Sequence, residues 1–264
     1  MLSLEYLLEE AKNNDLPILK RRAILREYLQ AIILNSLYKH NLGKLMFFTG
    51  GTALRFFYNM PRFSEDLDFD TSGLNFKEFE AISKGIEKGL LKEGFSSKVS
   101  AKKRGNLFIV ELYFEDLMRL YEITDKRGLD LMIKIEVYKP GWDLHTEPGV
   151  LSLYGYNFSS ILLSKGNLLS EKLCALFNRN RGRDIHDTLF MLKRKFPFDE
   201  DVLAANKIKG SPKELILDHL AKLTEKELKS LANQVKPFLF KEDDIELILK
   251  APLYAERFLR DYEW

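Results

Sequence analysis

The chain has 264 residues, of which 45% are hydrophobic and 30% are charged, and its formal net charge is +2. This composition is typical of a globular protein with a sizeable core and excludes a disordered chain. The balance of 41 basic against 39 acidic residues gives no overall signature of nucleic-acid binding, although it is compatible with a local basic patch. The single cysteine, Cys174, excludes an internal disulfide and a cysteine-rich zinc site.

Cysteine usage and hydropathy indicate a cytoplasmic protein. A single thiol fits a reducing compartment, and the first ten residues carry acids but no basic stretch typical of a signal peptide. No apolar run is long enough to cross a bilayer, so we expect no membrane partner.

Up to about residue 164, helical and strand-like patterns of hydrophobicity alternate. Apolar residues three and four apart indicate helices, and short apolar or alternating runs that end at glycine, proline or polar clusters indicate strands. The elements expected here are, in chain order, helices over 2–13 and 17–40, a strand over 45–48, a turn at Gly50 and Gly51, a helix over 52–59, a strand over 66–70, a helix over 76–93, strands over 95–100, 107–114 and 129–138 with a turn over 102–106, and one or two strands over 150–163.

The pattern changes near residue 165, after which nearly every segment has helical spacing. Breaks near Pro197, 210–212, Pro237 and Pro252 divide this part into several helices. We therefore predict two domains, an α/β domain over residues 1–164 and a helical domain over residues 165–264.

Gly50 and Gly51 lie between an expected strand and an expected helix. Two glycines allow a sharp turn and leave no side chains in the way, and the backbone N–H groups at a helix start form an anion site that suits a triphosphate. No Gly-Lys-Ser/Thr follows, so the turn is not a P-loop. The alternative is an ordinary strand-to-helix turn in which Thr52 caps the helix.

Asp66 and Asp68 are two residues apart in an expected strand, so their carboxylates project from one face. Two such acids repel each other unless a cation lies between them, and Mg²⁺ prefers carboxylate and phosphate oxygens. The alternative is a solvated strand face, which is weakened by Leu67 and Phe69 because they anchor the strand in the core. We expect Asp70, at the strand end, to be a cap or a solvated acid.

Glu136 is a candidate third acid. Ile135 and Val137 face the core in an alternating run, so Glu136 faces the other way. If its strand lies beside that of the two aspartates, Glu136 reaches the same metals and helps to deprotonate an acceptor hydroxyl. The alternative is an exposed glutamate beside Lys134.

Arg62 and Ser64 come just before the acid strand. Arg62 either contacts phosphate with two hydrogen bonds or pairs with Glu65 or Asp66. Ser64 either supports the triphosphate or caps the local turn.

The helical part carries a second group of charges. Lys172 falls off the apolar stripe of its helix, and Asp184 and Asp187 lie three apart on one helical face. Lys172 is placed to neutralise phosphate charge, while Asp184 orients Lys172 or an arginine, or acts on the acceptor. The alternative is a solvated helix with ordinary ion pairs.

Together these residues resemble the nucleotidyltransferase AbiEii/AbiGii toxin family, within the DNA polymerase β-like nucleotidyltransferase superfamily. The resemblance runs from about residue 45 to 192. It implies an α+β fold, with a small mixed β-sheet and flanking helices, a helical C-terminal domain and a cleft between the two. The residues that carry the resemblance are Gly50, Gly51, Thr52, Arg62, Ser64, Asp66 and Asp68, then Lys172, Arg179, Arg183, Asp184 and Asp187.

The resemblance also implies roles. Asp66 and Asp68 are implied metal ligands, with Glu136 less settled because family members differ at the third acid. The implied phosphate contacts are Gly50, Gly51 and Thr52, although many members carry serine where this chain has Thr52. Lys172 is implied as the base that handles the nucleotide, and Asp184 as an essential acid.

We therefore predict a nucleotidyltransferase that depends on Mg²⁺ or Mn²⁺ and moves a nucleoside monophosphate from a triphosphate to an acceptor hydroxyl, at the end of tRNA or another RNA. The family implies the toxin of a toxin–antitoxin or phage-defence system, with a cognate antitoxin as partner. The alternatives are a module that binds GTP or another triphosphate without turnover, or a transferase acting on a small molecule or a protein.

Two local groups of basic residues favour an RNA acceptor, because phosphate contacts need clustered cations. The alternative is that both are solvated faces. The groups are Lys98, Lys102, Lys103 and Arg104 in one hairpin, and Arg179, Arg181, Arg183, Lys193, Arg194 and Lys195 in the helical part.

Overall fold

A computed structural model describes residues 1–262 of the chain, which form two compact units. The first unit contains residues 1–59, 63–140 and 146–162, and the second contains residues 60–62, 141–145 and those from Leu163 onward. Among the described residues, no helix has the length and apolar character needed to span a membrane.

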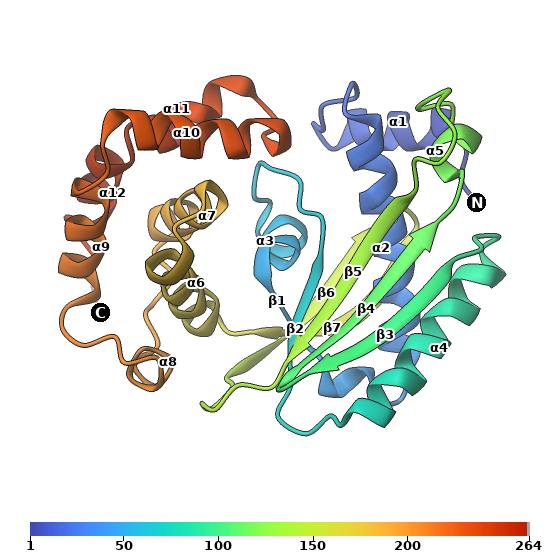
Figure 1. The fold of residues 1–264 in the computed structure, drawn as a ribbon, viewed down its shortest axis with the longest axis horizontal. Helices are drawn as coiled ribbons and strands as arrows, with labels where there is room; N and C mark the ends of the chain where they lie inside the picture. The colour runs from blue at the N-terminus through green and yellow to red at the C-terminus, as the bar shows by residue number, and fades with distance from the viewer. Residues whose placement is uncertain (263–264) are drawn as a thin grey trace. The chain divides into compact units, whose positions relative to one another are not determined.

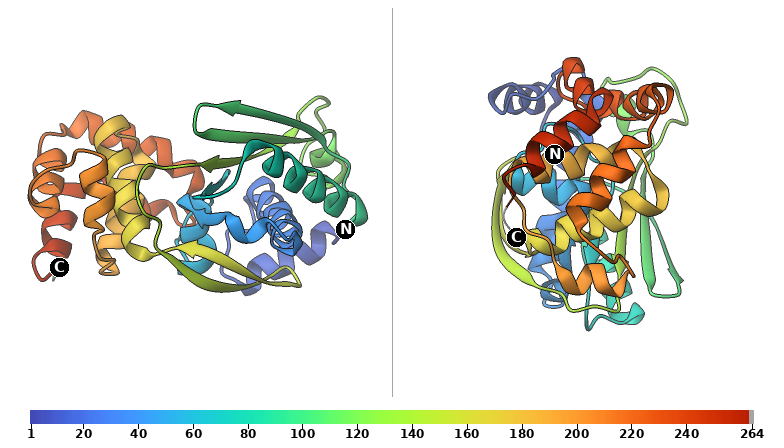
Figure 2. Two further views of the ribbon diagram at one scale, coloured as in Figure 1. Left: turned by 90° about the horizontal axis from the view of Figure 1, so that it is seen from below. Right: turned by 90° about the vertical axis from the view of Figure 1, so that its left-hand side faces the viewer.

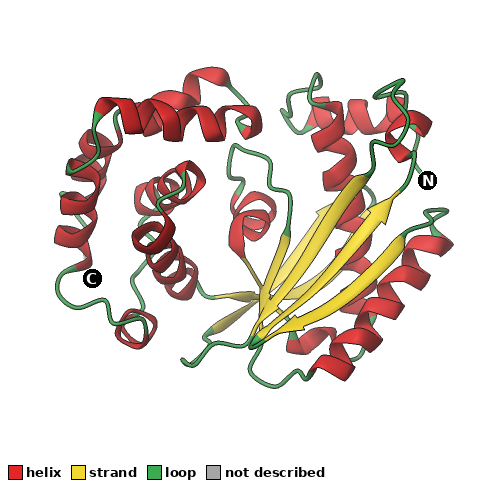
Figure 3. Cartoon of the chain, viewed as in Figure 1, coloured by secondary structure: helices red, strands yellow, loops and turns green. Residues whose placement is uncertain are grey.

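The first unit is built on a mixed sheet, which has seven strands in the described residues (Figures 1 and 3). The strands are β1 (Phe47–Thr49), β2 (Leu67–Asp70), β3 (Lys98–Arg104), β4 (Leu107–Phe114), β5 (Leu131–Tyr138), β6 (Thr146–Leu153) and β7 (Tyr156–Leu163). They lie in the order β3-β4-β5-β2-β1-β7-β6. β2 pairs antiparallel with β1 and parallel with β5, and β1 pairs parallel with β7, so the acid-bearing strand is central.

Helices cover the apolar face of this sheet. Alternate residues of β5 are buried, as a strand with one face in the core requires. α2 contacts α4 and β5, and α4 contacts β3 and β4. The helices of this unit are α1 (Leu4–Asn13), α2 (Arg21–Lys39), the 3₁₀ turn η1 (Gly43–Leu45), α3 (Gly50–Tyr58), α4 (Phe76–Lys92) and α5 (Leu117–Leu120).

Helix α2 is buried against the sheet. In the left view of Figure 2, α2 lies between the β3–β4 end and the β6–β7 end of the sheet. Consequently α2 is buried around most of its circumference, including the polar side chains of Arg26, Glu27 and Gln30. Buried polar groups need hydrogen-bond partners, and the partners of Arg26 and Gln30 lie in the segment just before β2.

The structure corrects several expected boundaries in this unit. The helix expected to start at Thr52 begins at Gly50, and β6 begins at Thr146, four residues before the expected start. Residues 102–104, expected in a turn, belong to β3. β3 is an edge strand with largely exposed side chains, so a run of basic residues there does not end the strand.

The second unit is helical. Its central helix α7 is almost wholly buried and contacts α6, α10, α11 and α12. The helices are α6 (Lys165–Arg179), α7 (Gly182–Lys193), α8 (Glu200–Ala205), α9 (Pro212–Ala221), α10 (Glu225–Val235), α11 (Glu246–Leu249) and α12 (Ala251–Leu259), with 3₁₀ turns η2 (Lys236–Phe238) and η3 (Glu242–Ile245). The expected fold class, a mixed sheet with flanking helices followed by a helical domain, is confirmed.

A short segment from earlier in the chain completes this unit. Arg62 pairs antiparallel with Leu239, and the backbone N–H of Phe240 donates to the carbonyl of Pro61 at 3.0 Å. Residues 60–62 are therefore held by backbone hydrogen bonds against the segment after η2. These bonds fix the backbone position from which the Arg62 side chain extends.

Candidate active site

The glycine turn is shaped around Asp68. Gly50 has φ of +73°, a left-handed conformation that suits glycine. A Cβ atom on Gly50 would lie 2.2 Å from Oδ2 of Asp68, so the carboxylate packs directly against the glycine backbone. Both the conformation and the space therefore require glycine at this position.

The start of α3 offers an anion site. Gly50, Gly51 and Thr52 are its first three residues, and the N–H groups of a first helical turn have no acceptor within the helix. The first turn of α3 contains no acid of its own, and the carboxylate of Asp68, from β2, packs against its first glycine. The residue before the helix is Thr49, so the alternative in which Thr52 caps the helix was wrong.

The Thr52 side chain has a structural role. Thr52 is fully buried, and its hydroxyl donates to the backbone carbonyl of Asp66. This bond ties the start of α3 to the residue before β2. The hydroxyl is therefore used within the fold, which explains why a hydroxyl residue is suitable here.

Three carboxylates gather on one face of the sheet. Asp68 lies opposite Thr49 on β1 and opposite Glu136 on the parallel strand β5. Asp66 immediately precedes β2, and all three acids are half-buried. Asp70, which we expected to be a cap or a solvated acid, is instead 4% exposed, because the end of β2 lies between β1 and β5.

Lys134 lies among these acids. Its Nζ is 3.6 Å from Oδ2 of Asp66 and 3.1 Å from Oε2 of Glu136. Burial opposes the charge of Lys134, but the neighbouring carboxylates outweigh that effect and raise the pKa of its ammonium. The carboxylates therefore hold a cation at this place.

The donor set fits a divalent cation in chemistry. Half-buried carboxylate oxygens are the ligands that Mg²⁺ and Mn²⁺ prefer, and the place already attracts an ammonium group. As the side chains are oriented, residues 1–262 contain no cluster of three acidic, histidine or cysteine side chains that could hold a metal. Asp66 and Asp68 are therefore the main ligand candidates, and both Asp66 and Glu136 would first have to release Lys134.

Polar groups of α2 hold the segment before β2. Nε2 of Gln30 donates to the backbone carbonyls of Ser64 and Glu65, at 3.2 and 3.0 Å. Arg26 forms an ion pair with Glu65 at 2.9 Å. Ser64 thus contributes its carbonyl to this arrangement. Arg26 and Gln30 were missed from the sequence, although they lie four residues apart, on one face of α2.

The second unit contains a buried network of charges around α7. The guanidinium of Arg62 donates two hydrogen bonds to Asp187, from Nε at 2.8 Å and from Nη2 at 2.6 Å. Nζ of Lys172 is 3.1 Å from Asp187 and 3.5 Å from Asp184. Both of these Arg62 hydrogen bonds therefore go to Asp187, a partner that we had not considered. The partners expected from the sequence were Glu65 and Asp66.

Asp184 is held from the other side by Arg179, which donates two hydrogen bonds of 2.9 Å. Asp184 and Asp187 are 1% and 0% exposed, so the alternative of a solvated helix face was wrong. Burial would raise the pKa of Asp187, but the charges of Arg62 and Lys172 outweigh it and hold that pKa well below its usual range. The pKa of Asp184 is lowered in the same way, by Arg179 and Lys172 against burial.

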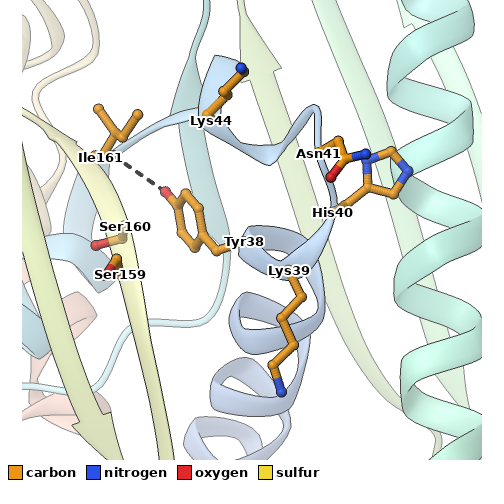
Figure 4. Close-up of a pocket in the computed structure, with 8 residues that line it drawn as sticks. All are labelled: Tyr38, Lys39, His40, Asn41, Lys44, Ser159, Ser160 and Ile161. Atoms are coloured by element: carbon orange, nitrogen blue, oxygen red, sulfur yellow. Dashed lines mark hydrogen bonds between the residues drawn. The ribbon is translucent and has the colours of Figure 1, made fainter.

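A separate pocket of about 650 Å³ lies at the end of α2 (Figure 4). It is lined by Lys44 before β1 and by Ser159 and Ser160 on β7, which runs parallel to β1. Since Gly50 follows β1, this pocket lies at the opposite end of that strand from the glycine turn. Figure 4 shows the side chains of Lys39 and Lys44 extending in different directions, so they do not converge on a shared ligand position.

Comparison with known proteins identifies a family for this chain. The sequence model of the family described as nucleotidyl transferase AbiEii toxin, type IV TA system, matches residues 32–252. A search of curated proteins found no match.

Solved structures with similar folds include three bacterial proteins. A putative nucleotidyltransferase from H. pylori has 20% identity and a TM-score of 0.59, covering 91% of this chain and 96% of that one. MenT4, a nucleotidyltransferase toxin from Mycobacterium tuberculosis, has 16% identity and a TM-score of 0.59, covering 100% and 91%. JHP933 from Helicobacter pylori has 19% identity and a TM-score of 0.54, covering 91% and 93%. At these identities the likeness shows a shared fold.

Proposed function

Because this chain belongs to the AbiEii nucleotidyltransferase toxin family, we propose that it moves a nucleoside monophosphate from a nucleoside triphosphate to a hydroxyl at the end of an RNA. The observation that supports this most directly is the contact between Gly50 and Asp68. It joins an anion site, which suits phosphates, to a carboxylate that suits a cation. A triphosphate brings both an anion and a cation to the site, because it binds proteins as a complex with a divalent ion.

The roles follow from the donors. The backbone N–H groups of Gly50, Gly51 and Thr52 bind phosphate oxygens. Asp66 and Asp68 would hold Mg²⁺ or Mn²⁺, and Glu136 would be a third ligand if Lys134 no longer paired with Asp66 and Glu136. When bound, the metal supplies charge stabilisation at the phosphates and lowers the pKa of the acceptor hydroxyl.

The reaction replaces one phosphorus–oxygen bond with another. The acceptor oxygen bonds to the α-phosphorus, the bond to the pyrophosphate oxygen breaks, and the hydroxyl proton passes to Glu136 or to solvent. For Lys172 we propose the role in nucleotide handling that the family resemblance implies. Asp184 and Asp187 position its ammonium, and Arg62 acts through Asp187, so we replace direct phosphate contact by Arg62 with a positioning role.

RNA as the acceptor is supported by local charge. Lys103 and Arg104 are exposed on the edge strand β3, where a phosphate backbone can approach. A transferase that uses triphosphates and RNA acts where both are present, which is the cytoplasm. Family membership also implies a cognate antitoxin as a partner.

The test is transfer of label from α-³²P nucleoside triphosphates to total tRNA with Mg²⁺. We expect labelled RNA from the unchanged protein and none from Asp66→Ala or Asp68→Asn. Glu87→Gln, an exposed acid on α4 of the same unit, serves as the control and should label normally.

Equal labelling by Asp66→Ala and the unchanged protein contradicts the proposed site. Triphosphate binding by calorimetry, with no release of pyrophosphate for any acceptor, supports a binding module without turnover. Label on protein or on a small molecule, with unlabelled RNA, identifies a different acceptor class.

A further inference from the structure

A second pocket, of about 400 Å³, lies in the helical unit among α6, α9 and the loop that joins α8 to α9. Its inner wall includes Phe177 and His219, which are half-buried. Its rim carries Lys207, Lys209 and Lys222, all exposed. None of these residues belongs to the carboxylate cluster or to the buried network around α7, so the pocket requires its own explanation.

The inner wall offers aromatic surface. The rings of Phe177 and His219 meet edge to face with centroids 5.3 Å apart. Nε2 of His219 lies 3.3 Å from Oδ1 of Asn180, an atom that only accepts, so Nε2 carries the proton. Burial, and to a smaller degree the charge of Lys222, lowers the pKa of His219, which keeps the ring neutral. Two neutral rings give a surface against which a nucleobase can pack.

The three lysines carry charges that the fold does not neutralise. Within residues 1–262, none of Lys207, Lys209 and Lys222 forms an ion pair with a carboxylate, whereas Lys236 and Lys250 of the same unit do. One acid, Asp218, lies at the rim, which leaves an excess of positive charge.

The backbone of Lys207 has an unusual conformation for a lysine. Lys207 has φ of +60°, the left-handed conformation that ends helices and that glycine adopts at least cost. A lysine in this position is less favourable for the fold than glycine, and its ammonium stands at the pocket rim.

We propose that this pocket binds an unpaired nucleotide of an RNA, with the base against Phe177 and His219 and the flanking phosphates at the three lysines. A pocket that joins aromatic faces to unneutralised cations matches single-stranded nucleic acid, because duplex RNA hides its base faces. The choice of RNA over a free nucleotide rests on the proposed function, in which RNA is the acceptor.

The experiment measures binding of a fluorescein-labelled, single-stranded RNA of ten nucleotides by anisotropy, without triphosphate. The test variant is Lys207→Gln, Lys209→Gln and Lys222→Gln together. The control variant changes three exposed lysines of the same unit, Lys226→Gln, Lys229→Gln and Lys241→Gln. We expect the test variant to bind about tenfold more weakly and to lower the slope of log K against log salt by about two, with less than a twofold change in the control.

The aromatic wall is tested separately. Phe177→Leu keeps an apolar side chain but removes the ring, and should weaken binding about tenfold with the salt slope unchanged. Competition by a duplex of the same sequence should be weak. If AMP competes as well as the RNA does, the ligand is a free nucleotide. Circular dichroism melting of each variant confirms that it is folded.

Equal losses in the test and control lysine variants, or unchanged binding by Phe177→Leu, overturn the proposal. The outcome is separable from that for the proposed function, since Asp66→Ala should bind the RNA normally. If RNA binding depends on the pocket but no nucleotide is transferred, the pocket proposal is supported and the transferase proposal is contradicted. If nucleotide is transferred but the pocket variants have no effect on RNA binding or transfer, the transferase proposal is supported and the pocket proposal is contradicted.

Discussion

At the scale of single residues, Gly50 carries the strongest geometric constraint in the carboxylate cluster. An added Cβ would lie 2.2 Å from the carboxylate of Asp68, and the backbone of Gly50 is left-handed. Both facts concern the same few atoms that we propose bind phosphate and metal, so a small change here affects structure and ligand binding together.

Gly50→Ala should lower both stability and triphosphate binding. The added Cβ meets Asp68 and strains the backbone, at a cost of about 1–3 kcal/mol. Thermal melting and calorimetry with a triphosphate measure the two effects. Gly73→Ala is the matched control, because no atom lies within 4 Å of its added Cβ. A normal melting temperature and normal binding in Gly50→Ala would count against the contact.

Lys134→Met tests the cation site. Removing the ammonium leaves Asp66 and Glu136 facing each other, so we expect the metal-free protein to lose about 1 kcal/mol. Mn²⁺ should then stabilise the variant more than the unchanged protein, because the metal no longer displaces a lysine. Melting curves with EDTA and with Mn²⁺ measure this. Equal shifts by Mn²⁺ in both proteins would show that Lys134 and the metal do not compete.

Asp187→Asn tests the buried network. Arg62 would keep its buried charge but lose its two hydrogen bonds to a carboxylate, which costs about 3–5 kcal/mol. Because the pKa of Asp187 is depressed on folding, its contribution is present above the ordinary aspartate pKa of about 3.9 and is lost as pH falls toward the folded value. Stability of the unchanged protein should therefore fall below about pH 4, and that of Asp187→Asn should fall less steeply in urea unfolding at each pH.

At the scale of elements, the site depends on a four-residue strand and a buried helix. β2 is short, yet it lies between β1 and β5, so its register is set on both sides. Gln30 of α2 also holds the residues just before β2, because its side chain donates hydrogen bonds to their carbonyls. The acids are thus positioned by neighbouring elements more than by β2 itself.

Gln30→Leu should loosen this hold. The carbonyls of Ser64 and Glu65 lose their buried donor, which costs about 1–3 kcal/mol. Because Asp66 follows directly, Mn²⁺ affinity should fall as well. Leu29→Met, a volume-conserving change at the neighbouring buried position, is the control. Stability loss with unchanged Mn²⁺ affinity would restrict Gln30 to a structural role.

At the scale of the whole molecule, the two units do not correspond to two uninterrupted stretches of chain. Residues 60–62 and 141–145 leave the first unit and join the second. Arg62 is one of them, and it supplies the charge that balances Asp187.

A fragment of residues 163–264 should therefore be unstable alone. Without Arg62, the buried carboxylate of Asp187 loses its guanidinium partner and keeps the ammonium of Lys172. We expect the loss of Arg62 to destabilise the fragment by about 3–5 kcal/mol. Asp187→Leu should restore part of this stability in the fragment, although it destabilises the full chain. Urea unfolding of the four proteins measures both effects, and a fragment as stable without the substitution as with it contradicts the account.

Much of the fold could be predicted from local patterns. β4 and α4 lie within a residue of their expected bounds, since both have strong periodicity and clear ends, with a capping box at Asn75 and Glu78 for α4. The basic end of β3 was taken for a turn, because composition cannot show that a strand lies at a sheet edge.

By itself, the sequence determined the glycine pair, the two aspartates, the lysine and acids of the second block, and the family to which they belong. These are local signals, and local chemistry is enough to recognise them. Tertiary structure alone decided that Glu136 lies opposite Asp68, that Lys134 stands between the carboxylates, and that Arg62 meets Asp187, 125 positions away. The reason is that a charge buried by folding must meet its opposite in space, and the folded path of the chain decides which one it meets.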